Sequence, residues 1–210
     1  MSKVAKTYIW RMTHYTNIGF ILQNGVHSSN GQVHDPNYVN IGHRTLIAGR
    51  GQSPIALPPG GVLNDYVPFY FHYKMPMLYH IYQGVVPDYA GTQQEIIYLV
   101  STAEHIHSLN IPFIFSDRHA YLQHKTIYNS LADLSRLNWT VIRDDTWFQV
   151  YTALRKELKQ AEFLVYEHLP VNALMGIVCH NDQIANFVQV AITQANLNLQ
   201  VVVKPEYYYP

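Results

Sequence analysis

The chain has 210 residues, 48% of them hydrophobic, which is enough for one domain around a buried core. Its 14 Lys and Arg residues balance 14 Asp and Glu residues, which excludes the overall basic charge that supports non-specific nucleic-acid binding. Cys179 is the single cysteine, so an internal disulfide and a cysteine-built zinc site are also excluded.

The N-terminal segment combines a strand with a short helix. Residues 8–13 have strand-like character. Thr16 can cap a helix with apolar residues on one face, and Gly25 can end that helix in the left-handed conformation. Residues 28–59 carry few periodic apolar positions and many Gly, Asn, His and Pro. We therefore predict a long, partly irregular loop there, with a functional role.

Short strands and short helices alternate along the rest of the chain. Ser101 and Glu104 have the spacing of a capping box, and Asn181 can cap a helix whose apolar residues share one face. Interleaving of this kind, without successive βαβ units, is typical of an α+β fold. The other predicted elements are strands at residues 67–73, 95–100, 113–116, 162–166 and 199–203, and helices at residues 77–83 and 131–137.

Domain organisation and location follow from what the sequence lacks. It contains no internal repeat and no linker rich in Pro, Gly and Ser, so we predict a single domain over residues 1–210. No stretch approaches the roughly 18 apolar residues of a membrane span, and we expect a cytoplasmic protein. Neither G-x-G-x-x-G nor a P-loop occurs, so a Rossmann hydride site and a nucleoside triphosphatase are not supported.

Glu162 is the leading candidate for a catalytic carboxylate. It opens an otherwise apolar predicted strand, in the sequence Gln160-Ala161-Glu162. A glutamate at a strand end commonly faces water, which is one interpretation. The functional interpretation is a carboxylate in a cleft that hydrogen-bonds a ribose hydroxyl and stabilises a sugar cation.

Three further side chains are candidates for a binding site. Alternation along the first strand puts Arg11 on the same face as Thr13, where its donor fork can hold a phosphate or simply face water. Tyr70, in an aromatic block, can stack on a flat ring or fill a hydrophobic strand. His119 follows a buried strand, which is a common place for site residues, although an exposed histidine beside a cap has the same pattern.

Five motifs in the chain belong together. They are Thr13-His14 with Asn17, Gly60-Gly61-x-Leu63-x-Asp65-Tyr66-Val67-Pro68-Phe69-Tyr70-Phe71, Pro76-Met77-Leu78, Pro112-Phe113-x-Phe115-x-Asp117-x-His119, and Gln160-Ala161-Glu162. In these motifs, which follow the family's order, the chain resembles the DarT family of DNA ADP-ribosyltransferase toxins, and the second motif is highly specific. The resemblance implies an ADP-ribosyltransferase-like split β-sheet with a central NAD-binding cleft flanked by short helices.

The resemblance also implies a reaction and its residues. ADP-ribose is transferred from NAD⁺ to a thymine base in a short motif of single-stranded DNA, and nicotinamide is released. Glu162 and Arg50 are the implied catalytic residues, and His119 lies on the DNA-facing side of the catalytic site. Because a guanidinium stays protonated in proteins, an electrostatic role suits Arg50 better than proton removal. The implied NAD⁺ contacts are Arg11, Met12, Thr13, His14, Phe20, Ser28 and Tyr70.

The segment before Glu162 corresponds to the substrate-recognition loop of such transferases. An aromatic ring can stack on an unpaired base, so Trp147 and Tyr151 are predicted to contact DNA, as His119 is. Arg155 and Lys159 are predicted to meet phosphates. A mixed surface loop and helix is the alternative interpretation of this segment.

The implied partners are single-stranded DNA and a DarG-like macrodomain antitoxin that removes the modification; the chain itself contains no macrodomain. We assign no metal, because His105 and His107 do not share a helix face and the Cys179-His180 pair lacks a carboxylate partner. Three other hypotheses stay open at this point: transfer to guanine or another acceptor, a catalytically silent NAD⁺- or nucleic-acid-binding protein, and a small structural domain.

Overall fold

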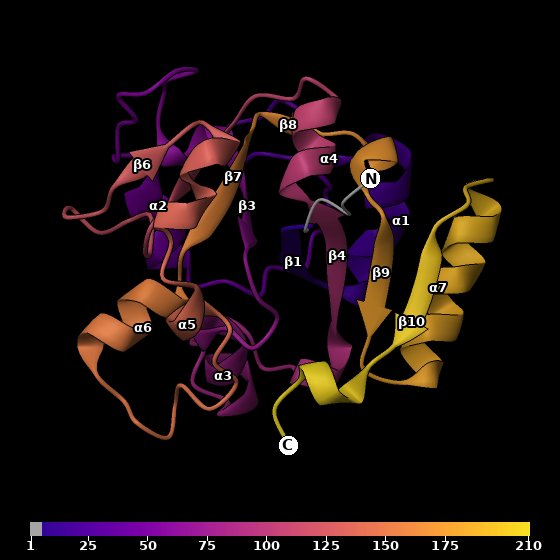
Figure 1. Ribbon diagram of the computed structural model, residues 1–210. Coiled ribbons are helices and arrows are strands. Elements are labelled where there is room, and N and C mark those ends of the chain that lie inside the picture. The colour runs from indigo at the N-terminus through magenta and orange to yellow at the C-terminus, as the bar shows by residue number, and fades with distance from the viewer. Residues whose placement is uncertain (1–5) are drawn as a thin grey trace, which may run out of the picture.

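The fold is built on an eight-stranded sheet (Figure 1). The computed structural model describes residues 6–210; residues 1–5, which belong to the predicted domain, lie outside the described residues. The strand order is β10-β9-β4-β1-β3-β7-β5-β6, and β2 with β8 forms a separate two-stranded sheet. The strands are β1 (Tyr8–His14), β2 (Val26–His27), β3 (Tyr66–Tyr70), β4 (Ile96–Thr102), β5 (Phe113–Ser116), β6 (Ile127–Tyr128), β7 (Glu162–Tyr166), β8 (His168–Leu169), β9 (Gly176–Cys179) and β10 (Gln200–Val203).

The large sheet is split between β1 and β3. Strand β1 pairs antiparallel with β4 along its whole length, but it joins β3 only through the pair Trp10–Tyr70. Strand β3 then pairs antiparallel with β7, which places Tyr70 opposite Glu162. Because one register pair holds the two halves together, they diverge on either side of it. The structure therefore confirms the predicted α+β fold with a split sheet.

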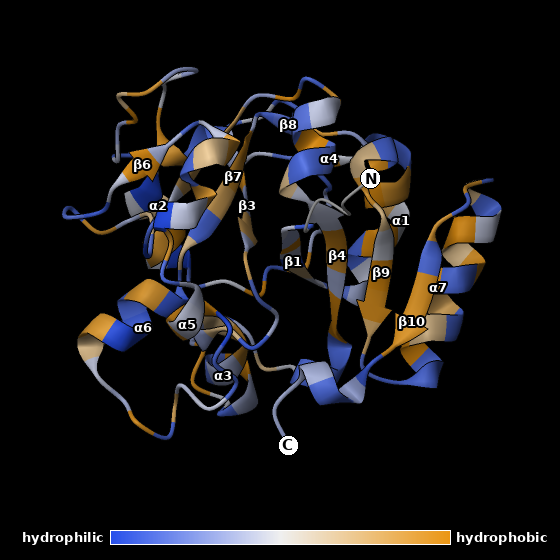
Figure 2. Cartoon of the chain, viewed as in Figure 1, coloured by the Kyte–Doolittle hydropathy of each residue, from blue (hydrophilic) through white to orange (hydrophobic). Residues whose placement is uncertain are grey.

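Within residues 6–210, seven α-helices pack around the sheet, and Figure 1 labels each of them. The longest, α7, buries Ile184, Val188 and Ile192, which are spaced four residues apart and face β9 and β10. Figure 2 shows the hydrophobic colour along both strands. Asn181 caps this helix as predicted, because its side-chain oxygen accepts from the backbone of Ile184 at 3.0 Å. The helices are α1 (Ile18–Asn24), α2 (Arg44–Arg50), α3 (Pro76–Tyr82), α4 (Ala103–Ser108), α5 (Trp139–Ile142), α6 (Ala153–Lys159) and α7 (Asp182–Gln194).

Many of the tyrosines belong to the core. Tyr98, Tyr208 and Tyr209 lie in one hydrophobic cluster and are almost fully buried. Their hydroxyls donate to backbone carbonyls, as in the 2.8 Å bond from Tyr98 to Tyr73 and the 2.9 Å bond from Tyr208 to Ile96. A buried tyrosine needs such a partner. Part of the unusual tyrosine content therefore serves packing instead of ligand stacking.

The predicted irregular loop at residues 28–59 contains the helix α2, which is a correction. None of the residues of α2 is buried. Without an apolar stripe that packs on the core, the sequence lacks the periodicity from which a helix is recognised. The rest of this region forms turns and irregular backbone that pass over the sheet.

Two predicted caps are also corrected. Thr16 is exposed and lies in a 3₁₀ turn, and α1 begins at Ile18 after that turn. Thr102 caps α4 by accepting from the backbone of His105, whereas Ser101 donates to a backbone carbonyl of another segment. The predicted helix at residues 131–137 is a 3₁₀ helix, Leu131–Arg136. The predicted boundaries of the strands at residues 113–116 and 162–166 are confirmed.

Candidate active site

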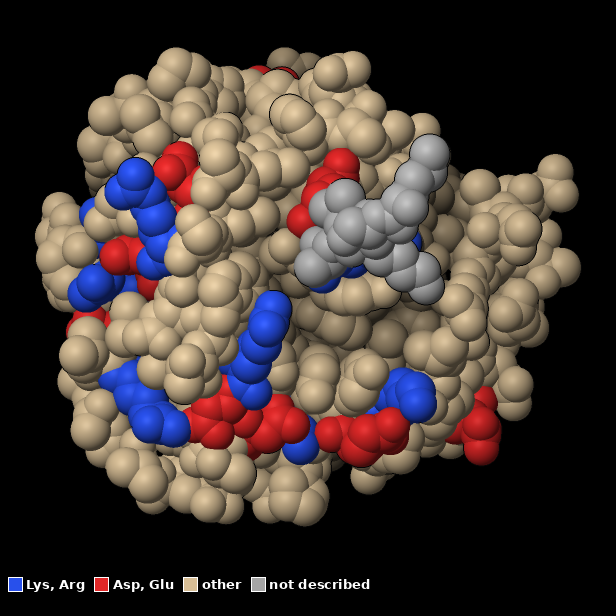
Figure 3. All heavy atoms as spheres, in the orientation of Figure 1, with Lys and Arg blue, Asp and Glu red and all other residues tan. Residues whose placement is uncertain are grey.

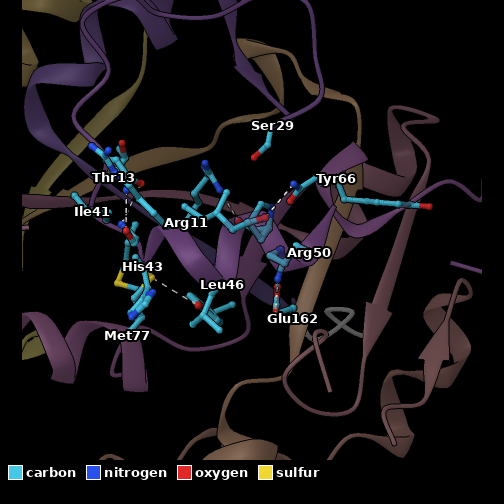
Figure 4. A pocket seen from close by; sticks show the side chains of 18 of the residues that line it. Arg11, Thr13, Ser29, Ile41, His43, Leu46, Arg50, Tyr66, Met77 and Glu162 are labelled. Atoms are coloured by element: carbon cyan, nitrogen blue, oxygen red, sulfur yellow. Dashed lines mark hydrogen bonds and ion pairs between the residues drawn. The ribbon is translucent and has the colours of Figure 1, made fainter. Parts of the chain in front are cut away.

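A cavity of about 1020 Å³ opens where the sheet splits (Figure 4). Its volume lies at the upper end of the range for small-molecule sites, so it accommodates a dinucleotide-sized ligand. Strands β1, β3 and β7 form its floor, and α2, α3, α6 and the segment before α2 form its walls. Of the residues predicted to be functional, these line it: Arg11, Met12, Thr13, Phe20, Ser28, Arg50, Tyr70, His119, Tyr151 and Glu162.

Glu162 is buried at the start of β7, and only 1% of its surface is exposed. Its Oε1 accepts from the backbone N–H of Ala120 at 3.0 Å, and its Oε2 accepts from Arg50 Nη1 at 2.9 Å. Burial of an ionised carboxylate requires such partners. The interpretation of Glu162 as a strand-end residue that faces water is therefore wrong.

Arg50 supplies the countercharge from the last residue of α2. Its Nη1 approaches both carboxylate oxygens of Glu162, as the dashed lines in Figure 4 mark, at 3.3 and 2.9 Å. Its Nη2 is buried without a hydrogen-bond partner among residues 6–210. A buried donor without a partner fits an oxygen atom of a bound ligand.

His119 reaches the carboxylate from another side. Its Nε2 lies 3.9 Å from Glu162 Oε1, and its backbone N–H donates to Glu157 at 3.0 Å. Burial lowers the pKa of the His119 imidazole below 6.5, and the nearby Glu162 charge only partly opposes this. The imidazole is therefore neutral at pH 7 and has one ring nitrogen that can accept a hydrogen bond.

Arg11 and Tyr70 lie side by side in the floor of the cavity. Arg11 Nη1 donates to Pro68 at 3.0 Å, while Nε has no hydrogen-bond partner within the described residues. Burial, followed by the charge of Glu162, raises the pKa of the Tyr70 hydroxyl, which stays protonated at pH 7. The predicted common face of Arg11 and Thr13 is confirmed, because both line the cavity.

His14 does not lie in the cavity, although it is the neighbour of Thr13. Its Nδ1 lies 2.7 Å from Thr16 Oγ1, and its Nε2 lies 3.8 Å from Glu95 Oε1. The structure thus places His14 outside the lining of the cavity, so the predicted contact of His14 with NAD⁺ gains no support from the cavity.

Asn17 supports the wall of the cavity, although no local sequence pattern predicts a role for it. It is buried and donates to Thr13 Oγ1 and to the carbonyl of Val39, both at 3.0 Å. It also accepts from the N–H of Val39 at 2.9 Å. Asn17 therefore fixes the irregular segment before α2 against β1, and Tyr38 and Asn40 of that segment line the cavity. Only its place in a family motif singled it out.

The predicted DNA contacts differ in their outcome. Tyr151 lines the cavity and is 62% exposed. Trp147 is 2% exposed, and its Nε1 donates to the hydroxyl of Tyr209 at 2.8 Å. Lys159 is fully buried, and Arg155 forms an ion pair with Asp144. The structure contradicts direct DNA contacts by Trp147 and Lys159, because neither side chain reaches the surface.

Lys156 is the basic residue of α6 that lines the cavity. Its Nζ lies 3.4 Å from His80 Nε2 and 6.0 Å from the centre of the Tyr151 ring. On the face that Figure 3 shows, Lys and Arg side chains stand beside Asp and Glu, so that face has no broad basic surface. The cavity, by contrast, has four Lys and Arg side chains in its lining, those of Arg11, Arg44, Arg50 and Lys156.

Known proteins of one family are similar to this chain in sequence and in structure. The model of the family described as "ssDNA thymidine ADP-ribosyltransferase, DarT" matches residues 10–209. A DNA ADP-ribosyl transferase of Escherichia coli O127:H6 is 35% identical over 205 residues, which are 97% of this chain and 94% of that protein. The structure of Thermus sp. 2.9 DarT in complex with ADP-ribosylated ssDNA has a TM-score of 0.91 at 33% identity, covering 97% of this chain and 96% of that one. The same protein in complex with NAD⁺ has a TM-score of 0.87 at 33% identity, covering 97% and 98%.

The split sheet and the buried carboxylate in its cavity define an ADP-ribosyltransferase, an enzyme class that uses NAD⁺ as co-substrate. The chain belongs to the DarT family of DNA-modifying enzymes, as its motifs indicated. Within residues 6–210, no helix has the length and apolar character required to span a bilayer. No cluster of three metal-ligating side chains is found in the same part of the chain.

Proposed function

We propose that this chain transfers ADP-ribose from NAD⁺ to a thymine base in a short motif of single-stranded DNA, with Glu162 as the catalytic carboxylate. The observation that carries the proposal is the fixed position of Glu162 in the cavity. Ala120 and Arg50 hold its two oxygens. Such a carboxylate can hydrogen-bond a ribose hydroxyl and stabilise the positive charge that develops at the sugar as nicotinamide leaves.

Arg50 has an electrostatic and positional role in this proposal. Its guanidinium is already paired with Glu162 and remains protonated, so it is a poor acceptor for a proton. The Nη2 donor, which has no partner in the described chain, is available to the substrate. The neutral ring of His119 orients the thymine by accepting a hydrogen bond, because the base carries its only N–H at N3 when N1 is bound to deoxyribose.

The same proposal assigns the binding residues. Arg11, Met12, Thr13, Phe20, Ser28 and Tyr70 contact NAD⁺, for which the free Nε of Arg11 and the ring of Tyr70 are suited. Tyr151 stacks on a base of the DNA, and Lys156 meets a phosphate. Arg155 stays a candidate for a phosphate contact only if it leaves Asp144.

We expect an ADP-ribose group on a DNA base to stall replication, so the activity of such an enzyme requires control. We infer that the chain acts in the cytoplasm as a toxin and that a DarG-like macrodomain antitoxin, which removes ADP-ribose from DNA, is its partner. The family motifs support this inference. Co-expression with a DarG-like macrodomain protein should restore growth, and continued growth arrest would contradict the pairing.

Mass spectrometry of short oligonucleotides tests the reaction. The chain is incubated with NAD⁺ and with single-stranded oligonucleotides that each lack one base. We expect the mass of one ADP-ribose to be added only to oligonucleotides that contain thymine, and never to the one without it. Addition to the thymine-free oligonucleotide would make guanine or another base the acceptor. If the chain binds NAD⁺ but no oligonucleotide gains mass, the chain is a binding protein without this activity.

A further inference from the structure

Lys159 is a buried cation that the proposed reaction does not use. It is the last residue of α6 and precedes Glu162 by three positions. Its side chain is fully buried, and lysine is almost never fully buried without partners. Its Nζ donates to the carbonyl of Ile142 at 2.6 Å and to that of Asp144 at 2.9 Å, and it lies 3.3 Å from His72 Nδ1.

The hydrogen bonds around His72 show that Lys159 is the donor to the ring. The backbone N–H of Lys74 also donates to His72 Nδ1, at 3.2 Å, so this nitrogen is an acceptor. On the other side of the ring, Nε2 lies 3.4 Å from Asp145 Oδ1. Lys159 therefore meets three acceptors, and a protonated ammonium group has three N–H donors.

Charged groups of both signs surround the ammonium group of Lys159. Asp144 and Asp145 favour its charged form, whereas Lys74 and Arg155 oppose it. Burial is the largest effect and lowers the pKa of Lys159 to about 7. Burial likewise lowers the pKa of His72 to about 3, so this ring is neutral when it accepts from Lys159.

Of the carbonyls that Lys159 holds, that of Ile142 ends α5 and that of Asp144 lies near the start of residues 143–152, a segment without helix or strand. This segment is anchored again through Trp147 and ends at Tyr151, which lines the cavity. Its exposed side chains Val150 and Tyr151 gain little from packing, since they are 65% and 62% exposed. The buried anchors of the segment, which are the carbonyls held by Lys159 and the ring of Trp147, therefore decide where it lies.

We propose that Lys159 is a positioning residue that fixes residues 143–152 and thereby places Tyr151 at the mouth of the cavity. Lys159 touches neither substrate. Lys159 affects how well the enzyme uses the single-stranded DNA that accepts ADP-ribose, and it leaves the binding of NAD⁺ unaffected. The part of this proposal that concerns DNA rests on the proposed function, while the part that concerns the segment stands on the contacts alone.

The test compares Lys159→Met with the wild-type protein and with Lys204→Met, a control lysine whose side chain is 44% exposed. Three quantities are measured: amide hydrogen exchange in residues 143–152, the KM for a thymine-containing oligonucleotide, and the Kd for NAD⁺ by calorimetry. In Lys159→Met we expect faster exchange, a KM at least about tenfold higher and an unchanged Kd, because loss of position at a site is often that costly. Lys204→Met should match the wild type in all three.

Each of the other possible outcomes contradicts one part of the proposal. Wild-type exchange rates in residues 143–152 of Lys159→Met would refute the positioning role, and an equal loss of NAD⁺ binding would make Lys159 a general structural residue. If Lys159→Met does not fold, Lys159→Gln is used, because the amide keeps two N–H donors for the two carbonyls. Lys159→Gln should show smaller changes in the same direction. A wild-type protein that labels no oligonucleotide would refute the proposed function, while the exchange measurement would still test Lys159.

Discussion

At the scale of single residues, the site depends on a buried pair of opposite charges. Glu162 and Arg50 lie on different elements, and their side chains are 2% and 13% exposed. Each charge is tolerated in the interior because the other is present, so removing one leaves an isolated buried charge. The pair thus links catalytic competence to the stability of the fold around the cavity.

The variant Glu162→Gln separates charge from shape. We expect its DNA labelling to fall by at least about 100-fold, because stabilisation of developing charge contributes about that much in other active sites. We also expect a loss of stability of about 3 kcal/mol, because Arg50 keeps its charge without a partner. Urea denaturation and oligonucleotide labelling measure the two effects.

The double variant Glu162→Gln with Arg50→Met is the control for that experiment. It removes both charges, so it should recover much of the stability and none of the activity. If Glu162→Gln labels DNA at the wild-type rate, the carboxylate is not catalytic. If it is as stable as the wild type, the pair does not contribute to the fold.

The sequence could reveal some of these residues and not others. Glu162 could be found because a charge inside an apolar strand is conspicuous, but Arg50 lies on a helix without buried residues and has no local signal. The sequence predicts that Lys159 meets a phosphate of DNA, because lysine usually lies at the surface. Its burial depends on carbonyls 15 and 17 residues earlier in the chain, which no local pattern encodes.

At the scale of elements, the end of α1 is set by a glycine. Gly25 has a φ of +75°, and a Cβ atom there would come within 2.4 Å of both His168 Nε2 and the carbonyl of Leu169. We therefore expect Gly25→Ala to destabilise the protein by more than about 1 kcal/mol, since both the backbone conformation and the space oppose it. Thermal unfolding measures the effect.

Gly19, in the same helix, is the matched control. A Cβ atom at Gly19 would meet nothing within 4 Å. Gly19→Ala should stabilise the protein by about 0.5 to 1 kcal/mol, because alanine has the higher helix propensity. A melting temperature that falls equally in both variants would show that the contact of Gly25 with β8 is unimportant.

The segment before α2 depends on one amide. Asn17→Ala removes the three hydrogen bonds that join this segment and Thr13. We expect the Kd for NAD⁺ to rise about tenfold, which corresponds to the 1.4 kcal/mol scale of such bonds, while the rate at saturating NAD⁺ changes less. Calorimetry and labelling at high NAD⁺ concentration measure the two.

Asn24→Ala is the comparison for Asn17. The Asn24 side chain donates to Phe20 within α1 and does not touch the segment. Its Kd for NAD⁺ should equal that of the wild type. Equal Kd values for Asn17→Ala and the wild type would show that the segment is held by other contacts.

At the scale of the whole molecule, periodicity predicted the α+β class and the bounds of β5 and β7, but not the order of the strands. That order depends on pairs distant in sequence, such as Tyr70 opposite Glu162. Only the family motifs, which carry information on the whole fold, indicated the split sheet and its cavity. Contacts between distant segments decide the arrangement, so a local pattern cannot contain it.

Buried histidines make the whole fold sensitive to acid. Burial lowers the pKa values of His14, His27, His72, His80, His119 and His180, and that of His72 falls to about 3. These rings stay neutral in the folded protein, whereas in the unfolded chain they bind protons near pH 6.5. Unfolding therefore takes up protons below that pH. The stability that these neutral rings contribute is fully present above pH 6.5 and is lost as the pH falls through the folded pKa of each ring, which for His72 is about 3.

The variant His72→Gln isolates the largest of these contributions. Urea denaturation at pH 7.5 and at pH 5 should show a smaller loss of stability on acidification than in the wild type, by up to about 1.4 kcal/mol per pH unit for one proton. His107→Gln is the control, because His107 is exposed. Glutamine can still accept from Lys159, so a drop in stability at both pH values would indicate lost packing. If His72→Gln and the wild type lose the same stability between pH 7.5 and 5, protonation of His72 does not contribute to acid unfolding.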